Sequence, residues 1–286
     1  MNAHTMQSAA VLGSGTMGNG IAQVLAQTGL SVCLYDIAQP QLAKALQTIQ
    51  ANLDKGVEKG KVTAADRDAA MGRLRVSTDL MEAVKGVDVV IEAVPEKLQL
   101  KQEIFQQLGT HLGPQVLLAT NTSSLSISRI AAVTPHPERV VGMHFFNPVH
   151  IMELVEVVEA DKSSSAAVEA AMALSTRMGK DPIRVKDAPG FASSRLGIAI
   201  GLEAMRMVQE GVASPADIDK AMVLGYGFPM GPLQLTDLVG LDVRLNIAEY
   251  LYKELGDRFL APEILREKVA KGELGKKSGK GFYEWK

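Results

Sequence analysis

The residues best suited to chemistry in this chain are a histidine and a glutamate twelve positions apart. His144 ends the apolar segment 140–144, and Glu156 lies in the apolar segment 154–158. Histidine has a pKa that suits a base for a hydroxyl proton, as the oxidation of an alcohol requires. A carboxylate in an apolar segment needs a partner, and it would fix the tautomer of an imidazole. We therefore predict a His144–Glu156 dyad, with an ion pair that only braces two strands as the alternative.

The position of His144 at the end of a predicted strand separates it from the other histidines. In open α/β sheets, ligands bind beyond the carboxyl ends of strands. The segment 120–124 follows a predicted strand in the same way, so its hydroxyls can cap the next helix or bind a substrate oxygen. A hydrolase triad of Ser123, His144 and Glu156 is formally possible, but Ser123 lacks the G-x-S-x-G sequence that exposes such a nucleophile. The other histidines are His4, His111, His136 and His150.

A glycine-rich turn near the N-terminus predicts a dinucleotide site. An apolar segment is followed by G-x-G-x-x-G at Gly13, Gly15 and Gly18, and then by a helix-forming segment. In such a site the first glycine permits the tight turn, the second admits the pyrophosphate, and the third lets the helix approach the strand. The phosphates then face the helix N-terminus. The alternative is a purely structural strand–turn–helix unit.

Asp36 indicates which dinucleotide is bound. It ends the next predicted strand, where an acid binds the ribose hydroxyls. A carboxylate at this position repels a 2′-phosphate, and no arginine occurs in the following segment 37–40. We therefore predict NAD rather than NADP.

Composition limits the remaining functional classes. The 286 residues are 47% hydrophobic and 22% charged, which is typical of one large or two ordinary globular domains. The net charge of −2 gives no general attraction to nucleic acid or to an anionic membrane. The sequence contains no Cys/His cluster with metal-ligand spacing, no secretory signal and no apolar run that could span a membrane. We expect a cytoplasmic protein without a metal.

The order of the predicted elements divides the chain near Asp187. Up to about residue 185 strands and helices alternate, which predicts an α/β domain over residues 1–186 with a parallel sheet. Its polar region 39–73 is favoured to be a solvated helix pair, and a projecting arm that contacts an anionic substrate is the alternative. Residues 187–286 indicate helices and turns only.

Two segments of this second part stand out. The segment 196–208 is apolar on nearly every side, which predicts burial, partly against a second copy of the chain. The basic tail 275–283 is expected to be solvated, with contact to a phosphate as the alternative.

Several motifs together resemble the L-3-hydroxyacyl-CoA dehydrogenase family, in the family's order and spacing over the whole chain. The His-Phe-Phe-Asn-Pro block is the specific one, and the chain length is most similar to the bacterial 3-hydroxybutyryl-CoA dehydrogenases of this family. The motifs are Gly13-Ser14-Gly15-Thr16-Met17-Gly18, Asn121-Thr122-Ser123-Ser124, His144-Phe145-Phe146-Asn147-Pro148, Asp187-Ala188-Pro189-Gly190-Phe191 and Lys277-Ser278-Gly279-Lys280-Gly281-Phe282-Tyr283.

The resemblance implies a Rossmann-like NAD-binding domain followed by an all-helical domain that forms a homodimer. It implies that His144 is the base, that Glu156 orients it and that Ser123 binds a substrate oxygen near the nicotinamide. CoA contacts are expected at Asn52 and Lys59 on the helical arm, and at Ser123. The dinucleotide contacts thus expected are Gly13, Gly15, Thr16, Met17, Gly18, Asp36, Glu96, Lys101, Ser123, Asn147 and Lys277.

Two residues depart from the family pattern. Ser194 stands where the family often has an asparagine, and serine has a shorter side chain with a single donor. Either Ser194 keeps the contact with the substrate oxygen through a water, or Ser123 makes it alone. His150 stands where a proline is usual, and we expect it to face solvent rather than the acyl chain.

The sequence therefore predicts reversible, NAD-dependent oxidation of a short-chain (S)-3-hydroxyacyl-CoA, such as 3-hydroxybutyryl-CoA, to the 3-oxoacyl-CoA. One alternative is a dehydrogenase of a free 3-hydroxy acid, such as a sugar acid, which would not require CoA. The other is a protein that binds NAD without turnover.

Overall fold

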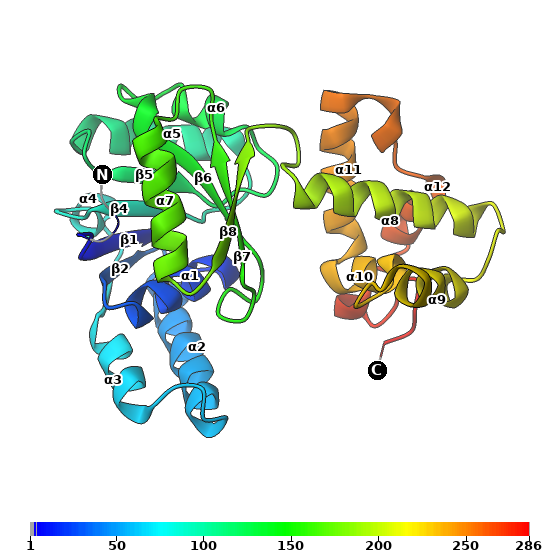
Figure 1. Ribbon diagram of the computed structural model, residues 1–286, viewed down its shortest axis with the longest axis horizontal. Coiled ribbons are helices and arrows are strands. Elements are labelled where there is room, and N and C mark those ends of the chain that lie inside the picture. The colour runs from blue at the N-terminus through cyan, green and yellow to red at the C-terminus, as the bar shows by residue number, and fades with distance from the viewer. Residues whose placement is uncertain (1–2, 4, 286) are drawn as a thin grey trace. The chain divides into compact units, whose positions relative to one another are not determined.

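The computed structural model describes residue 3 and residues 5–285, so His4 lies outside the described residues. The chain forms two compact units, Met1–Ala188 and Pro189–Lys286. Figure 1 shows their elements in chain order.

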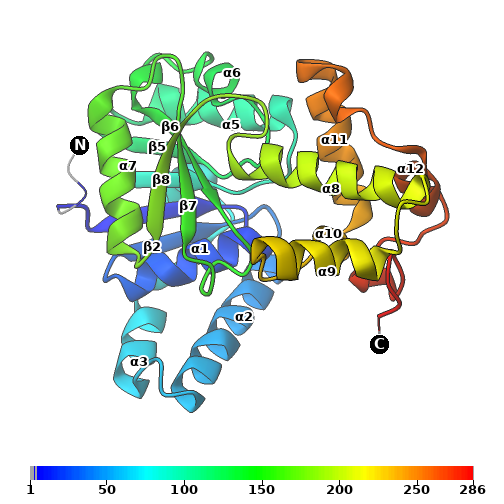
Figure 2. The ribbon, with the colours of Figure 1, turned by 45° about the vertical axis from the view of Figure 1, so that its right-hand side comes forward.

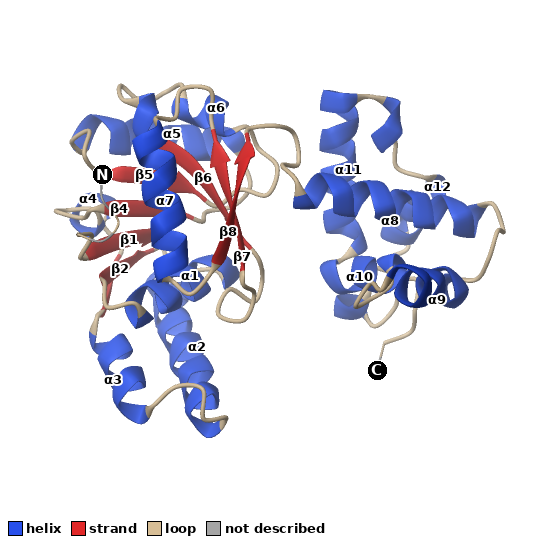
Figure 3. Ribbon diagram, viewed as in Figure 1, coloured by secondary structure: helices blue, strands red, loops and turns tan. Residues whose placement is uncertain are grey.

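The first unit is an α/β domain, as the alternating pattern predicts. Its strands form one eight-stranded sheet in the order β3-β2-β1-β4-β5-β6-β7-β8 (Figure 3). Its elements are β1 (Ser8–Leu12), α1 (Thr16–Gln27), β2 (Ser31–Tyr35), α2 (Gln39–Glu58), α3 (Ala64–Gly72), β3 (Leu74–Ser77), α4 (Leu80–Ala83), β4 (Val89–Glu92), α5 (Leu98–His111), β5 (Leu117–Thr120), α6 (Ile127–Ala131), η1 (Pro137–Arg139), β6 (Val140–Phe145), β7 (Leu154–Glu159), α7 (Ser165–Arg177) and β8 (Asp181–Lys186).

The sheet is parallel except where β7 runs antiparallel to β6. The connection between these two strands contains no helix, and a parallel crossover needs a longer segment, so the chain turns back beside β6. The central strands β4 and β5 are buried at every position, which explains their nearly continuous apolar sequences.

The strand order reverses between β1 and β4. From β1 the chain adds β2 and β3 toward one edge, and β4 then starts the other half of the sheet. In open α/β sheets, the crevice at such a switch point is where ligands bind.

The region 39–73 is a pair of helices, α2 and α3, which extend beyond the sheet (Figure 2). The buried residues of α2 recur every three to four positions and therefore form one apolar face; they are Leu42, Ala45, Ile49 and Leu53. The rest of α2 remains available to solvent or to a ligand.

The second unit is helical, as predicted. One face of α8 is buried in the unit's core through Ile198, Leu202 and Met205, but Leu196 is 64% exposed, so α8 is not buried on every side within the chain. The elements of the unit are α8 (Ser193–Gln209), α9 (Pro215–Tyr226), α10 (Pro232–Val239), α11 (Leu241–Leu255), η2 (Asp257–Phe259), α12 (Glu263–Ala270) and η3 (Lys276–Ser278).

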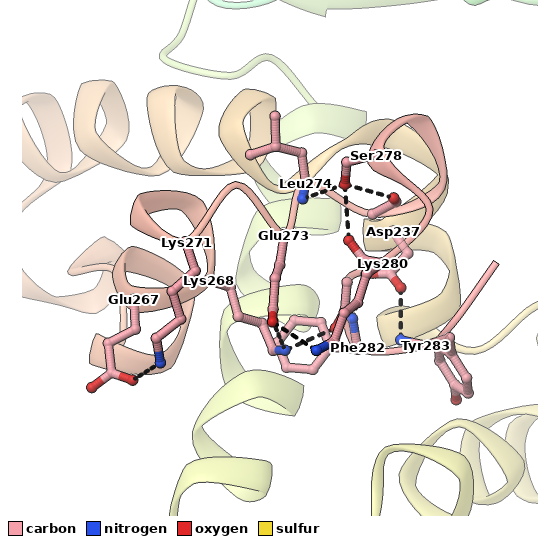
Figure 4. Close-up of polar contacts among 12 residues, drawn as sticks. Asp237, Glu267, Lys268, Lys271, Glu273, Leu274, Ser278, Lys280, Phe282 and Tyr283 are labelled. Carbon is pink, nitrogen blue, oxygen red and sulfur yellow. Dashed lines mark hydrogen bonds and ion pairs between the residues drawn. The ribbon is translucent and has the colours of Figure 1, made fainter.

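The glycine and aromatic residues of the tail dock on this unit, whereas Lys276, Lys277 and Lys280 are exposed, as expected. The fully buried carboxylate of Asp237 accepts hydrogen bonds from the backbone N–H groups of Phe282 and Tyr283 and from Trp285 Nε1, each at 2.9 Å. A Cβ on Gly281 would lie 2.2 Å from Asp237 Oδ1, so the tail can approach this carboxylate only through a glycine. Figure 4 shows Asp237 beside Tyr283. The glycines and aromatic residues of the tail thus serve its docking.

An ion pair network links the tail to α12. Glu273 lies 2.9 Å from the ammonium groups of both Lys268 and Lys280 (Figure 4). These two hydrogen-bonded cations lower the pKa of Glu273 to about 2. The positive charge of Lys280 in the tail is therefore already paired within the unit.

Replacing Asp237 with alanine is expected to destabilise the protein by about 2–5 kcal/mol, because three donors lose a charged acceptor in a buried site. Chemical denaturation of the variant measures this loss. The control is Glu267→Ala, which removes an exposed pair with Lys271 and should change stability by less than about 1 kcal/mol. Equal midpoints for Asp237→Ala and the wild type would contradict the role assigned to Asp237.

Candidate functional site

The three glycines of the turn between β1 and α1 differ in what surrounds them. Gly13 has φ +96°, and a Cβ there would lie 2.7 Å from the carbonyl oxygen of Ala93. A Cβ on Gly18 would lie 1.7 Å from the carbonyl oxygen of Gly13, whereas a Cβ on Gly15 would meet no atom within 4 Å. The first and third glycines therefore allow the turn and the close helix–strand packing, and the second leaves space above the helix N-terminus for a phosphate.

Asp36 lies beside this turn at the end of β2. Its Oδ2 accepts hydrogen bonds from the backbone N–H of Ser14 at 2.9 Å and from Ser14 Oγ at 2.7 Å, and its Oδ1 accepts one from Ala38 N at 3.2 Å. These bonds orient the carboxylate at the edge of a cavity of about 710 Å³. The lining of that cavity includes Gly13, Gly15, Thr16, Met17, Asp36 and Val94. The residues present therefore fit a dinucleotide whose ribose hydroxyls bind Asp36.

A buried ion pair lies at the switch point next to the turn. Glu92, the last residue of β4, is paired with Leu12 of β1, directly before the glycine turn. Lys101 Nζ of α5 lies 2.7 Å from Glu92 Oε1, and both side chains are fully buried. Burial raises the pKa of Glu92, and the Lys101 ammonium opposes that rise. The pair is neutral overall, which reduces the cost of burying either charge.

Glu96 connects this pair to the loop after β5. Its Oε2 lies 3.6 Å from Lys101 Nζ, while its Oε1 accepts hydrogen bonds from Thr122 Oγ1 at 2.5 Å and from the backbone N–H of Ser123 at 2.9 Å. The structure thus brings together Glu96, Lys101 and Ser123, three of the residues predicted to contact the dinucleotide.

His144 and Glu156 face each other across the antiparallel strands β6 and β7. The register places them directly opposite, and His144 Nδ1 lies 2.7 Å from Glu156 Oε2. Both side chains are buried, and the ring of Phe146 lies 4.6 Å from the imidazole, centroid to centroid. A carboxylate at Nδ1 fixes the tautomer and stabilises an imidazolium, so this geometry suits a histidine that accepts a proton at Nε2.

A second cavity, of about 440 Å³, adjoins the N-terminus of α1 on the side of α2. Asn52 and Asn147 line it together with Thr16. Lys59 does not share this position: it is exposed at the end of α2, about 10 Å along the helix from Asn52 at 1.5 Å per residue.

His150 is partly buried and lines this second cavity. Lys180 Nζ donates hydrogen bonds to the carbonyl oxygens of Val149 at 2.5 Å and Met152 at 2.9 Å, which holds the β6–β7 loop against the sheet. Burial and the neighbouring Lys180 lower the pKa of His150. A neutral imidazole therefore faces this cavity near pH 7.

Ser194 and Lys277 belong to the second unit. Ser194 lies in the first turn of α8, and Lys277 lies in η3, where its ammonium is 2.5 Å from Asp242 Oδ1. The ion pair with Lys277 and backbone hydrogen bonds lower the pKa of Asp242 against the opposing effect of burial.

Glu92 is the residue of this site that our sequence analysis missed. The signal was present, since Glu92 is an acidic residue inside the strand sequence Val-Val-Ile-Glu-Ala. Unlike Glu156, it has no histidine nearby in the sequence to indicate its partner. Lys101 lies in the next helix, among surface-type residues, and only the fold shows that it is buried.

Residues 3 and 5–285 contain neither a metal-binding cluster nor a membrane-spanning helix. In that part of the chain, no cluster of three or more His, Cys, Asp or Glu side chains is arranged to hold a metal ion. None of the helices there is both long and apolar enough to cross a membrane.

Two family models together match nearly the whole chain. Residues 8–188 match the model described as 3-hydroxyacyl-CoA dehydrogenase, NAD binding domain, and residues 190–285 match 3-hydroxyacyl-CoA dehydrogenase, C-terminal domain.

Individual relatives agree with these models. The chain is 46% identical over 277 residues to a probable 3-hydroxybutyryl-CoA dehydrogenase of Bacillus subtilis, which covers 96% of both chains. It is 45% identical over 283 residues to the 3-hydroxyadipyl-CoA dehydrogenase of Escherichia coli, covering 98% of this chain but only 59% of that protein. The solved (S)-3-hydroxybutyryl-CoA dehydrogenase of Ralstonia eutropha superposes with a TM-score of 0.95 at 42% identity, over 99% of this chain and 100% of the other.

Proposed function

The chain belongs to the 3-hydroxyacyl-CoA dehydrogenase family, whose members use NAD, and we propose that it oxidises a short-chain (S)-3-hydroxyacyl-CoA with His144 as the general base. The observation that carries this proposal is the buried contact of 2.7 Å between His144 Nδ1 and Glu156 Oε2 at the end of β6. The names of the B. subtilis and R. eutropha relatives support 3-hydroxybutyryl-CoA as the substrate.

His144 accepts the proton of the substrate's 3-hydroxyl group at Nε2 as the C3–H bond breaks. Glu156 holds the ring through Nδ1 and stabilises the imidazolium, so the proton moves without leaving an isolated buried charge. The Ser123 hydroxyl donates a hydrogen bond to the same substrate oxygen, and the Ser194 hydroxyl supports this contact. In the reverse reaction His144 returns the proton to the oxygen.

The turn 13–18 and Asp36 bind the cofactor's phosphates and adenosine ribose, and Glu96, Asn147 and Lys277 contact its remainder. Lys101, whose side chain is fully buried, acts on the cofactor through its contact of 3.6 Å with Glu96. When bound, NAD supplies the acceptor for the hydride that leaves C3. The open space at Gly15 and the fixed Asp36 carboxylate support this assignment.

The acyl-CoA lies along the helical arm, with Asn52 and Lys59 in contact with the CoA moiety. The position of Asn52 in the 440 Å³ cavity supports this placement, and the exposed ammonium of Lys59 can meet a phosphate.

A homodimer completes the proposal. Large apolar side chains are exposed on the second unit, among them Leu196 on α8 and Leu224 and Tyr226 on α9. Burying such a surface against a second copy of the chain is more favourable than leaving it exposed to water. Sedimentation as a monomer at micromolar concentration would contradict this part of the proposal.

The function is tested by the oxidation of NADH with acetoacetyl-CoA, run beside free acetoacetate and with NADPH as a second donor. We expect rapid turnover of the thioester with NADH, and slow turnover with NADPH because Asp36 repels a 2′-phosphate. Equal rates with free acetoacetate would instead identify a free-acid dehydrogenase. NADH binding without turnover of any 3-oxoacyl-CoA would identify a non-catalytic protein.

A further inference from the structure

One buried carboxylate joins three segments that border the crevice at the switch point. Glu92 accepts hydrogen bonds from the backbone N–H of Val94 at 2.7 Å, from Lys101 Nζ at 2.7 Å and from Thr120 Oγ1 at 2.6 Å. Val94 belongs to the turn after β4, Lys101 to α5, and Thr120 is the last residue of β5. Each of these segments continues toward the proposed cofactor site.

The cofactor cavity lies directly next to Glu92. The backbone N–H of Ala93 bonds to Leu12 O at 2.7 Å, and Ala93 and Val94 line the 710 Å³ cavity beside Gly13. Glu92 is therefore buried directly before the two residues that form this part of the cavity wall, and it does not line the cavity itself.

The contacts of Glu92 extend to the loop after β5 through Lys101. The Lys101 ammonium lies between Glu92 and Glu96, and Glu96 in turn holds the Ser123 backbone N–H and Thr122 Oγ1. Without the Glu92 carboxylate, the Lys101 ammonium would lose its shorter ion pair and shift toward Glu96 or out toward solvent. Both movements displace groups that the proposed function assigns to the dinucleotide.

We propose that Glu92 is a positioning residue for dinucleotide binding, which acts by fixing the ammonium of Lys101 and, through Glu96, the loop that carries Ser123. This inference rests on the proposed cofactor site. It assigns to Glu92 a role in affinity for the cofactor and not only in the stability of the sheet.

A purely structural role makes a different prediction. Breaking a buried ion pair by removing one partner destabilises a protein strongly, whereas replacing both partners with neutral groups is often neutral. A structural brace would therefore affect the melting temperature alone, while a positioning residue also changes the affinity for NADH in the folded protein.

The experiment compares Glu92→Gln, Lys101→Met and the double variant by NADH titration and by steady-state kinetics with acetoacetyl-CoA. We expect each single variant to raise the Kd and KM for NADH by about ten- to a hundredfold, the size of a hydrogen bond to a charged group. The KM for acetoacetyl-CoA should change less. Because Glu92 acts through Lys101, the double variant should bind NADH no more weakly than Lys101→Met alone.

The matched control is Glu159→Gln, which removes a carboxylate held by Arg184 and Lys186 at the far edge of the sheet. It should leave the Kd for NADH unchanged. If Glu92→Gln fails to fold, the double variant can replace it, because it contains no unpaired buried charge. A higher Kd for NADH in the double variant than in Lys101→Met would then reveal an effect of Glu92 that does not act through Lys101.

Two outcomes would overturn the inference: a Glu92→Gln variant that melts earlier but binds NADH with the wild-type Kd, or effects of the two single variants that multiply in the double variant. The proposed function fails separately. A wild type that binds NADH but reduces no 3-oxoacyl-CoA would remove the proposed reaction, while the NADH titrations would still decide the role of Glu92.

Discussion

Replacing His144 with glutamine is expected to lower kcat for acetoacetyl-CoA reduction by about 10²–10⁴-fold, the contribution of a positioned general acid or base. Glutamine is close to histidine in size and can still bond to Glu156, so the surrounding strands should keep their packing. It cannot exchange a proton with the substrate oxygen near pH 7. Steady-state kinetics at saturating NADH measures this loss.

NADH affinity provides the control for this variant. The glycine turn joins β1 to α1 and Asp36 directly follows β2, whereas His144 lies on β6, so the Kd for NADH should remain within about twofold of the wild type. A variant that retains most of its kcat would remove His144 from the role of base. A large loss of NADH binding with unchanged kcat would instead place His144 in the cofactor site.

Gly15→Ala is expected to lose NADH affinity, whereas Gly18→Ala is expected to lose stability. The added Cβ at Gly15 meets no protein atom within 4 Å, so Gly15→Ala should fold with nearly wild-type stability. The methyl group takes the space through which a phosphate approaches the helix N-terminus, so the Kd for NADH should rise at least about tenfold. At Gly18 the Cβ would lie 1.7 Å from a backbone carbonyl oxygen, so Gly18→Ala should lose about 2–4 kcal/mol of stability.

Thermal melting and NADH titration of both variants separate the two effects. The melting temperature should fall for Gly18→Ala and hold for Gly15→Ala, while NADH binding should weaken in Gly15→Ala although the protein is intact. Wild-type NADH affinity in Gly15→Ala would show that no phosphate approaches this glycine.

The features that the sequence by itself determined are those whose physical cause is local in the chain. The strand, the glycine turn and the helix that follows it are contiguous, so their residue types predict both the fold of the turn and the space left at Gly15. The alternation of strands and helices predicts the α/β class, because each crossover places a helix on a parallel sheet. The His144–Glu156 pair also has a local cause, since one short connection brings β7 back beside β6.

Only the tertiary structure showed which residues, far apart in the sequence, pair with a buried charged side chain. Glu92 meets Thr120 because β4 and β5 are neighbours in the sheet, and it meets Lys101 because α5 packs that lysine into the interior. Asp237 binds the backbone of Phe282 and Tyr283, more than 40 residues away, which docks the aromatic end of a tail whose lysines stay exposed. Where no suitable partner lies nearby in the sequence, as for Glu92 and Asp237, the sequence does not indicate which residue a buried charge will pair with. Burying a charge without a partner is unfavourable, and the tertiary fold determines which residue becomes the partner.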